Sequence, residues 1–140
     1  MTPARIIQEL NMQPHPEGGY FAETFRDAEG PEDRGYSTLI YYLLEKGQKS
    51  HWHRVDAVES WHYYAGTPLE LSITDGEAPV STVILGSNLL TGQRPQVIVP
   101  RNHWQSAQPM GAWTLVGCSV APGFLFSGFE MAANDWTPPQ

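Results

Sequence analysis

The stretch GQKSHWHRVDAVESWHYYAG, residues 47 to 66, decides both the expected fold and the candidate chemistry of this chain. It holds two histidines one residue apart, His51 and His53, and these are followed by Glu59 and His62. Side chains alternate between the two faces of a β-strand, so His51 and His53 are expected to point the same way. If Glu59 begins the next strand, two imidazoles and a carboxylate can converge on one ion or ligand. The stretch therefore predicts a site shared by two strands.

Working outward, the chain is punctuated by 13 glycines and 12 prolines that separate short runs, which is typical of many short strands joined by tight turns. Besides the strand with His51 and His53, the expected strands cover residues 20–26, 36–44, 60–65, 68–74, 79–86, 96–99, 103–107, 113–120 and 124–131. Thr2 and Pro3 predict a short helix that ends before Asn11. The pattern predicts one all-β domain, residues 1–140, folded as an antiparallel double-sheet barrel or jelly roll with a short N-terminal helix. Such a barrel can hold one small ligand.

Composition narrows the classes of partner. A net charge of −7 with only eight Lys and Arg residues argues against nucleic acid, because a binder needs cations to displace counterions from phosphates. The longest apolar block, within residues 36–44, is too short to span a bilayer, and the N-terminus does not resemble a secretory signal. Cys118 is the single cysteine, so it is expected to be a buried structural thiol of a cytoplasmic protein.

Two further segments supply candidate ligand-binding residues. In the strand 20–26, alternation separates Phe21 and Glu23 from Tyr20 and Arg26, and either Glu23 or Arg26 can touch a ligand or lie on a solvated edge. In the strand after Glu59, alternation turns Trp61 and Tyr63 inward and His62 outward, unless a bulge reverses the register. His62 is a secondary site candidate that could instead serve an interface.

Two motifs carry a resemblance to a known family. Gly47, the HxH pair, Glu59 and Gly66 resemble the first motif of the cupin superfamily, and VPRNHWQ at 99–105 resembles the second, with Asn102 at the glycine position and Gln105 where the fourth metal ligand is expected. HPEGGYFAETFR at 15–26, TLIYYLL, ESWHYYAGTPLEL and VAPGFLFSGFE at 120–130 look like the small single-domain family of unassigned function, the fifth cupin family. The resemblance implies a jelly roll, usually a homodimer, with a pocket compared to those of sugar-nucleotide epimerases and germins.

The resemblance and the donor types together predict a candidate metal site. The ligand set would be His51, His53, Glu59 and Gln105, and it suits a divalent metal such as Fe, Mn, Ni or Zn. A neutral amide is a weak ligand, so Gln105 weakens the site. His103 shares its strand parity and offers an alternative ligand. A pocket without a metal is the other possibility.

The enzymatic hypothesis is acid/base chemistry on a small, sugar-like substrate, as in an epimerase or isomerase. The expected catalytic residues are His53 as base, Glu59 as its orienting partner, and Tyr63 or Tyr20 as the opposing acid. Stacking walls are expected from Trp61, Trp104 and Phe21. Two alternatives stay open: a small-ligand binding module without turnover, and a structural dimer whose pocket is vestigial.

Overall fold

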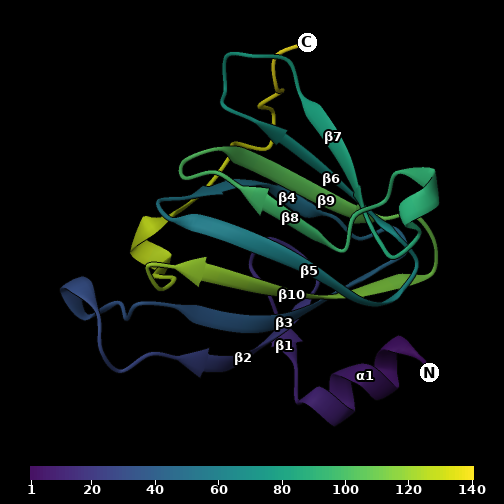
Figure 1. The fold of residues 1–140 in the computed structure, drawn as a ribbon, viewed down its shortest axis with the longest axis horizontal. Helices are drawn as coiled ribbons and strands as arrows, with labels where there is room; N and C mark the ends of the chain where they lie inside the picture. Colours follow the sequence, from purple (N-terminus) through teal and green to yellow (C-terminus); the bar gives the residue numbers. More distant parts are fainter.

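The computed structural model describes all residues from 1 to 140, and its strands form two antiparallel sheets (Figure 1). One sheet has the order β1-β2-β3-β10-β5-β8 and the other the order β11-β4-β9-β6-β7. The strands are β1 (Gln13–Pro14), β2 (Tyr20–Arg26), β3 (Thr38–Glu45), β4 (Ser50–Val55), β5 (Val58–Gly66), β6 (Leu69–Thr74), β7 (Ser81–Leu85), β8 (Gln96–Val99), β9 (Trp104–Pro109), β10 (Trp113–Ala121) and β11 (Phe129–Met131). The predicted all-β jelly roll with a short N-terminal helix is confirmed.

The helix α1 (Pro3–Leu10) forms where the capping residues predict it. The side chain of Thr2 accepts a hydrogen bond from the Arg5 N–H at 3.2 Å, which satisfies one of the free donors of the first turn. Asn11 ends the helix in the left-handed conformation, and Ile6 is the residue that α1 buries against the barrel. No helix in the structure combines the length and the apolar character that crossing a membrane would need.

The core lies between the two sheets and follows the alternation of the strands. In β6, Leu69 and Leu71 are fully buried while Glu70 between them is partly exposed. The ten residues of the largest buried cluster come from both sheets: Tyr42, Leu44, Trp61, Leu69, Leu71, Leu85, Val99, Ala107, Val116 and Cys118. Burial of the Cys118 thiol is therefore as predicted.

The predicted strands 36–44 and 124–131 begin later than expected, because other hydrogen bonds take their first residues out of the ladder. The Tyr36 N–H donates to the Glu29 carbonyl, so β3 begins only at Thr38. Phe124 donates its N–H to the Thr38 side-chain oxygen at 3.0 Å, and residues 126–128 form a 3-10 turn, η3 (Phe126–Gly128). Only Phe129–Met131 of the predicted strand 124–131 pairs with β4. The segment before it, residues 124–128, is free to contribute to the wall of a cavity. The other 3-10 turns are η1 (Pro31–Asp33) and η2 (Leu89–Thr91).

Candidate functional site

A small cavity opens between the sheets at one end of the barrel, with a volume of about 60 Å³. One water needs about 10–15 Å³ of volume measured in this way, so the cavity has room for about four to six waters. Part of its wall is aromatic and consists of Phe21, Phe124, Phe126 and Phe129. The ionisable side chains that line it are His15, Glu17, Glu23, Arg26, His53 and Glu59. An apolar wall with a few convergent polar groups is typical of a small-molecule site.

The bend between β1 and β2, residues 15–19, carries two of these side chains into the barrel. Its turn is closed by the Gly18 N–H, which donates to the His15 carbonyl at 3.0 Å. Gly18 has φ +112°, and a Cβ there would lie 2.1 Å from the Lys49 carbonyl oxygen, so only glycine fits. The His51 N–H donates to the Glu17 carbonyl at 2.8 Å and ties the bend to β4. The bend is therefore held rigidly, with Glu17 buried.

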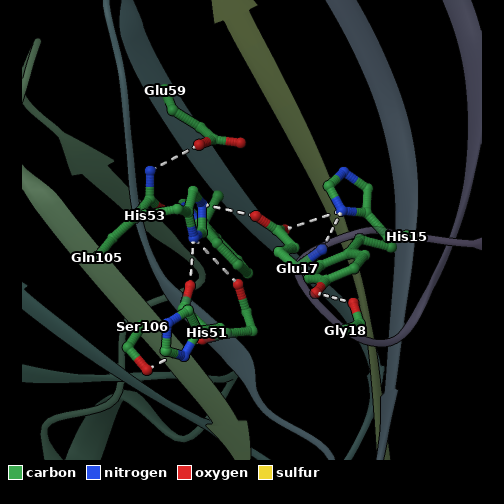
Figure 2. Close-up of polar contacts among 11 residues, drawn as sticks. His15, Glu17, Gly18, His51, His53, Glu59, Gln105 and Ser106 are labelled. Atoms are coloured by element: carbon green, nitrogen blue, oxygen red, sulfur yellow. Dashed lines mark hydrogen bonds and ion pairs between the residues drawn. The ribbon is translucent and has the colours of Figure 1, made fainter. Parts of the chain in front are cut away.

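Glu17 and His53, which both line the cavity, form a buried ion pair (Figure 2). Glu17 Oε2 lies 2.8 Å from His53 Nε2, and the two side chains are 7% and 2% exposed. Burial alone would lower the pKa of His53, but the charge and hydrogen bond of Glu17, with help from Glu59, raise it to about 9. Burial opposes ionisation of Glu17 too, yet the neighbouring His53 charge holds the pKa of Glu17 below its usual value. His53 is thus cationic and Glu17 anionic at neutral pH.

The other ring nitrogen of His53 is also engaged. His53 Nδ1 donates to the backbone carbonyl of His51 at 2.7 Å. Since both N–H groups of the imidazolium have protein acceptors, His53 has no free lone pair with which to take a proton from a ligand. Its contribution to the cavity is a fixed positive charge beside Glu17.

Glu59 stands at the head of a buried chain of hydrogen bonds. Its Oε1 accepts from Gln105 Nε2 at 2.8 Å, and Gln105 Oε1 accepts from Trp61 Nε1 at 2.8 Å. Glu59 Oε2 has no nitrogen or oxygen partner in the protein, and no fully buried side-chain oxygen is unpartnered, so Oε2 is reachable from the cavity. Burial, opposed by His53 and reinforced by Glu17, raises the pKa of Glu59 to about 7.

His15 supplies the cavity with a hydrogen-bond donor. Its Nδ1 accepts from the Glu17 N–H at 3.1 Å, which places the ring proton on Nε2. That Nε2–H has no protein acceptor, and because no fully buried side-chain nitrogen is unpartnered, it faces the cavity. Burial lowers the pKa of His15, and the nearby His53 charge lowers it further against the pull of Glu17. The ring is therefore neutral and packs edge-on against Phe21, with the centroids 4.7 Å apart.

Glu23 and Arg26 line the mouth of the cavity, and a bulge puts them on the same face. The register between β2 and β3 shifts between Glu23 and Phe25, which corrects the strict alternation expected for this strand. Arg26 Nη2 donates to Glu23 Oε1 at 2.7 Å, and Arg26 Nη1 donates to the Phe124 carbonyl at 2.8 Å. The pair therefore joins β2 to the segment 124–128 across the opening.

A second bulge separates the two histidines of the HxH motif. The register between β4 and β9 shifts between Ser50 and His53, so these two residues face the interior while His51 is only half-buried. His51 Nε2 donates to the Ala132 carbonyl at 3.0 Å and does not line the cavity. The expectation that His51 and His53 point the same way is corrected for this reason.

The predicted metal ligands do not form one donor set. Only His53 and Glu59 of the four line the cavity, and Gln105 turns its amide N–H to Glu59 and its oxygen to Trp61. No three His, Cys, Asp or Glu side chains are grouped so as to hold a metal ion. The alternative ligand His103 precedes β9, where its Nδ1 contacts the Arg101 carbonyl at 3.2 Å. The side chains present in this arrangement do not fit a divalent metal.

The remaining predicted site residues lie away from the cavity. Tyr20 packs on the α1 side of the barrel, and the Tyr63 hydroxyl donates to the Gly66 carbonyl at 2.6 Å. His62 contacts the Ser119 hydroxyl at 3.3 Å, on the face opposite Trp61, as alternation predicts. Trp61 is buried in the core, and Trp104 lies on the outer side of its sheet under Arg54 and Trp136. Of the predicted ligand-binding residues, Phe21, Glu23 and Arg26 line the cavity.

Sequence reasoning missed His15 and Glu17. The segment PHPEGGY predicts only a fixed bend, although it places two ionisable side chains one residue apart on a backbone held by prolines and glycines. The only signal for them in the sequence is that His15 and Glu17 lie one residue apart in a segment fixed by two prolines and two glycines. The phenylalanines at 124, 126 and 129 were likewise assigned to a strand instead of a cavity wall.

Comparison with known proteins gives the family. The family model described as Cupin superfamily (DUF985) matches residues 4–132. A crystal structure of a protein from Shewanella oneidensis is 33% identical with a TM-score of 0.91, covering 95% of this chain and 85% of that one. A hypothetical protein from Leishmania major is 30% identical with a TM-score of 0.88, covering 95% and 88%. No curated protein matches the chain.

More distant structures share the fold alone. Oxalate decarboxylase from Bacillus subtilis is 12% identical with a TM-score of 0.65, and the match covers 84% of this chain and 29% of that one. The resemblance seen in the two sequence motifs is confirmed by the match over residues 4–132, and the chain belongs to the DUF985 family of the cupin superfamily.

Proposed function

We propose that the cavity binds the reactive end of a small polar molecule and catalyses proton transfer on it, as an isomerase or epimerase does. The observation that supports this most directly is that a free carboxylate oxygen, Glu59 Oε2, and a free ring N–H, His15 Nε2–H, face the same 60 Å³ cavity. A base beside a hydrogen-bond donor is what removal of a proton next to a carbonyl requires.

Glu59 is the base in this proposal. Its pKa of about 7 lies near ordinary assay pH, which balances the ionised fraction against the driving force for accepting a proton. His53, the residue expected to be the base, has a pKa of about 9 and both of its N–H groups are engaged. In this proposal it is therefore a fixed cation. Tyr63 and Tyr20 have no part in the chemistry.

His15 is the hydrogen-bond donor in this proposal. Glu59 would take a proton from the carbon next to the carbonyl, the electron pair of that C–H bond would form a C=C bond, and the π pair of the carbonyl would move to its oxygen. The neutral Nε2–H of His15 would hold that oxygen while negative charge develops on it. Return of the proton to the same carbon, from either face, would give back the starting molecule or its epimer. If that carbon carries a hydroxyl, transfer of the hydroxyl proton to the former carbonyl oxygen and return of the carbon-bound proton to the former carbonyl carbon would give the isomer. No oxidant or other reagent is consumed.

The cavity volume limits how much of a sugar-like substrate can enter. At about 60 Å³, which is room for about four to six waters, it admits a reacting carbonyl with a few neighbouring atoms, so the rest of a larger molecule would extend past Glu23 and Arg26. A sugar nucleotide would therefore lie almost entirely outside the barrel, which favours compact substrates.

Deuterium uptake tests the proposal. Small carbonyl compounds incubated with the protein in D2O should exchange the proton next to the carbonyl faster than without protein, as followed by proton NMR. Glu59→Gln should abolish the enzyme-dependent rate. The matched control is Glu70→Gln, because Glu70 also accepts a glutamine amide, from Gln108 at 3.4 Å, but lies outside the cavity. Exchange that persists unchanged in Glu59→Gln would refute the role of Glu59.

A second candidate function is a binding module without turnover. It is favoured by the aromatic wall, since an apolar lining is suited to holding an apolar group. Ligands that raise the melting temperature of the protein but show no deuterium uptake would support this function over catalysis. A ligand at about 100 times its dissociation constant should stabilise the fold by about 2.7 kcal/mol.

A further inference from the structure

The cavity is lined by more carboxyl groups than cations. Each cation has its own carboxylate: His53 pairs with Glu17 at 2.8 Å, and Arg26 pairs with Glu23 at 2.7 Å. The remaining lining carboxyl, Glu59, has no cation of its own, and its hydrogen-bond donors, the Gln105 amide and the Cys118 thiol, are neutral. The cavity therefore offers an entering anion no free cation, while it presents one unpaired acid.

An anionic ligand would have to break one of the existing pairs. His53 is fully committed, because both ring N–H groups have acceptors inside the protein. Arg26 is held by Glu23 on one side and by the Phe124 carbonyl on the other. Releasing Arg26 would leave Glu23 facing the new anion at the mouth, and Glu59 would face it further in. The negative charges of carboxylates that line a small cavity disfavour the binding of an anion there.

The wall of the cavity is consistent with an uncharged guest. The rings of Phe21, Phe124, Phe126 and Phe129 form much of the surface, and an aromatic ring offers an anion no hydrogen-bond donor. A carboxylate or phosphate placed against these rings would lose water without gaining a partner. A carbonyl oxygen, in contrast, needs one donor, and His15 Nε2–H supplies one.

Resting on the proposed function, we infer that the substrate is an uncharged ketone or aldehyde whose reacting end carries no carboxylate or phosphate. The pairing of His53 with Glu17 and of Arg26 with Glu23 is the observation behind this choice. A site for keto acids or sugar phosphates would need a free cation to bind their charged group, and this cavity has none.

The test compares two molecules that differ in charge and share a four-carbon chain, butanone and 2-oxobutanoate. Both have a CH2 group next to a ketone, so deuterium uptake at this carbon can be followed in D2O by proton NMR with the wild-type protein. The rate without protein is subtracted for each compound, and measurements at about pH 8 keep Glu59 ionised. We expect the enzyme-dependent rate for butanone to exceed that for 2-oxobutanoate by about tenfold or more.

Each outcome decides the inference. Uptake into butanone with little or none into 2-oxobutanoate supports it. Equal or faster uptake into 2-oxobutanoate overturns the inference and leaves the proposed proton transfer standing, and loss of that uptake in Arg26→Gln would then identify Arg26 as the anion partner. Failure of both compounds to exchange overturns the proposed function together with the inference. Because the comparison of butanone with 2-oxobutanoate uses only the wild-type chain, its outcomes do not depend on whether a variant folds.

Discussion

Replacing Glu59 by glutamine should change the pH dependence of stability in a defined direction. Glu59 is 8% exposed, and burial raises its pKa from an ordinary value of 4.5 to about 7. The folded protein therefore holds the Glu59 proton more tightly than the unfolded chain, and this group's favourable contribution is complete below pH 4.5. The contribution is lost as the pH rises through about 7. At about 1.36 kcal/mol for each pKa unit, the loss amounts to about 3 kcal/mol.

Glu59→Gln keeps the shape of the side chain and the acceptor for Gln105 Nε2, but it cannot ionise. Urea unfolding at a series of pH values should show the variant gaining about 3 kcal/mol on the wild type between about pH 4 and about pH 8. His53, Glu17 and Cys118, which lie near Glu59, titrate in both proteins and largely cancel in the difference. Glu70→Gln should run parallel to the wild type. A stability difference between Glu59→Gln and wild type that stays constant over this range would refute the argument.

Four further predictions follow from the site and its surroundings. Glu17→Gln should lower the pKa of His53 from about 9, as measured by NMR titration of the ring. It should also lower the free energy of unfolding by about 3 kcal/mol, because it leaves a buried charge unpaired. A His53 pKa that stays near 9 would show that Glu17 does not set it. Gly18→Ala should lower the urea midpoint by an amount equivalent to about 2 kcal/mol or more, since its Cβ would lie 2.1 Å from the Lys49 carbonyl oxygen; Gly47→Ala, with no atom within 4 Å, is the control, and equal losses would contradict the close approach. Treatment with a chelator should leave the melting temperature unchanged, because the predicted metal ligands are engaged with one another and with the backbone; a drop that added metal reverses would overturn this. The homodimer remains a prediction, and light scattering should give twice the 15.6 kDa of one chain.

The sequence was sufficient for the architecture because alternation and turn residues are local signals. The runs at residues 68–74 and 96–99 alternate or are bounded clearly enough to predict β6 and β8, and the Thr2 cap predicts α1. The prediction of a strand over residues 124–131 was wrong for most of its length. Its aromatic residues favour a strand on composition, but a bond from the Phe124 N–H to Thr38 Oγ1, 86 residues away, draws this segment off the ladder.

The candidate site was predictable only where parity was undisturbed. His53 and Glu59 line the cavity, as do Phe21 and Glu23, which alternation puts on one face of β2. Bulges in β2 and β4 then reversed the parity of Arg26 and His51, and a one-residue bulge leaves no strong signal in a single sequence. The Glu17 contact with His53 joins residues 36 positions apart through a bend, so local patterns could not predict it.

The bend at residues 15–19 has a consequence for how the chemistry of this barrel can change. His15 and Glu17 reach the cavity from a connection between strands, whereas the β-ladders are formed by other residues. Substitutions in this five-residue bend can therefore replace His15 and Glu17 without changing a residue that pairs in the two sheets. The barrel then provides a constant scaffold, and the short connection between β1 and β2 provides side chains that can vary between related proteins.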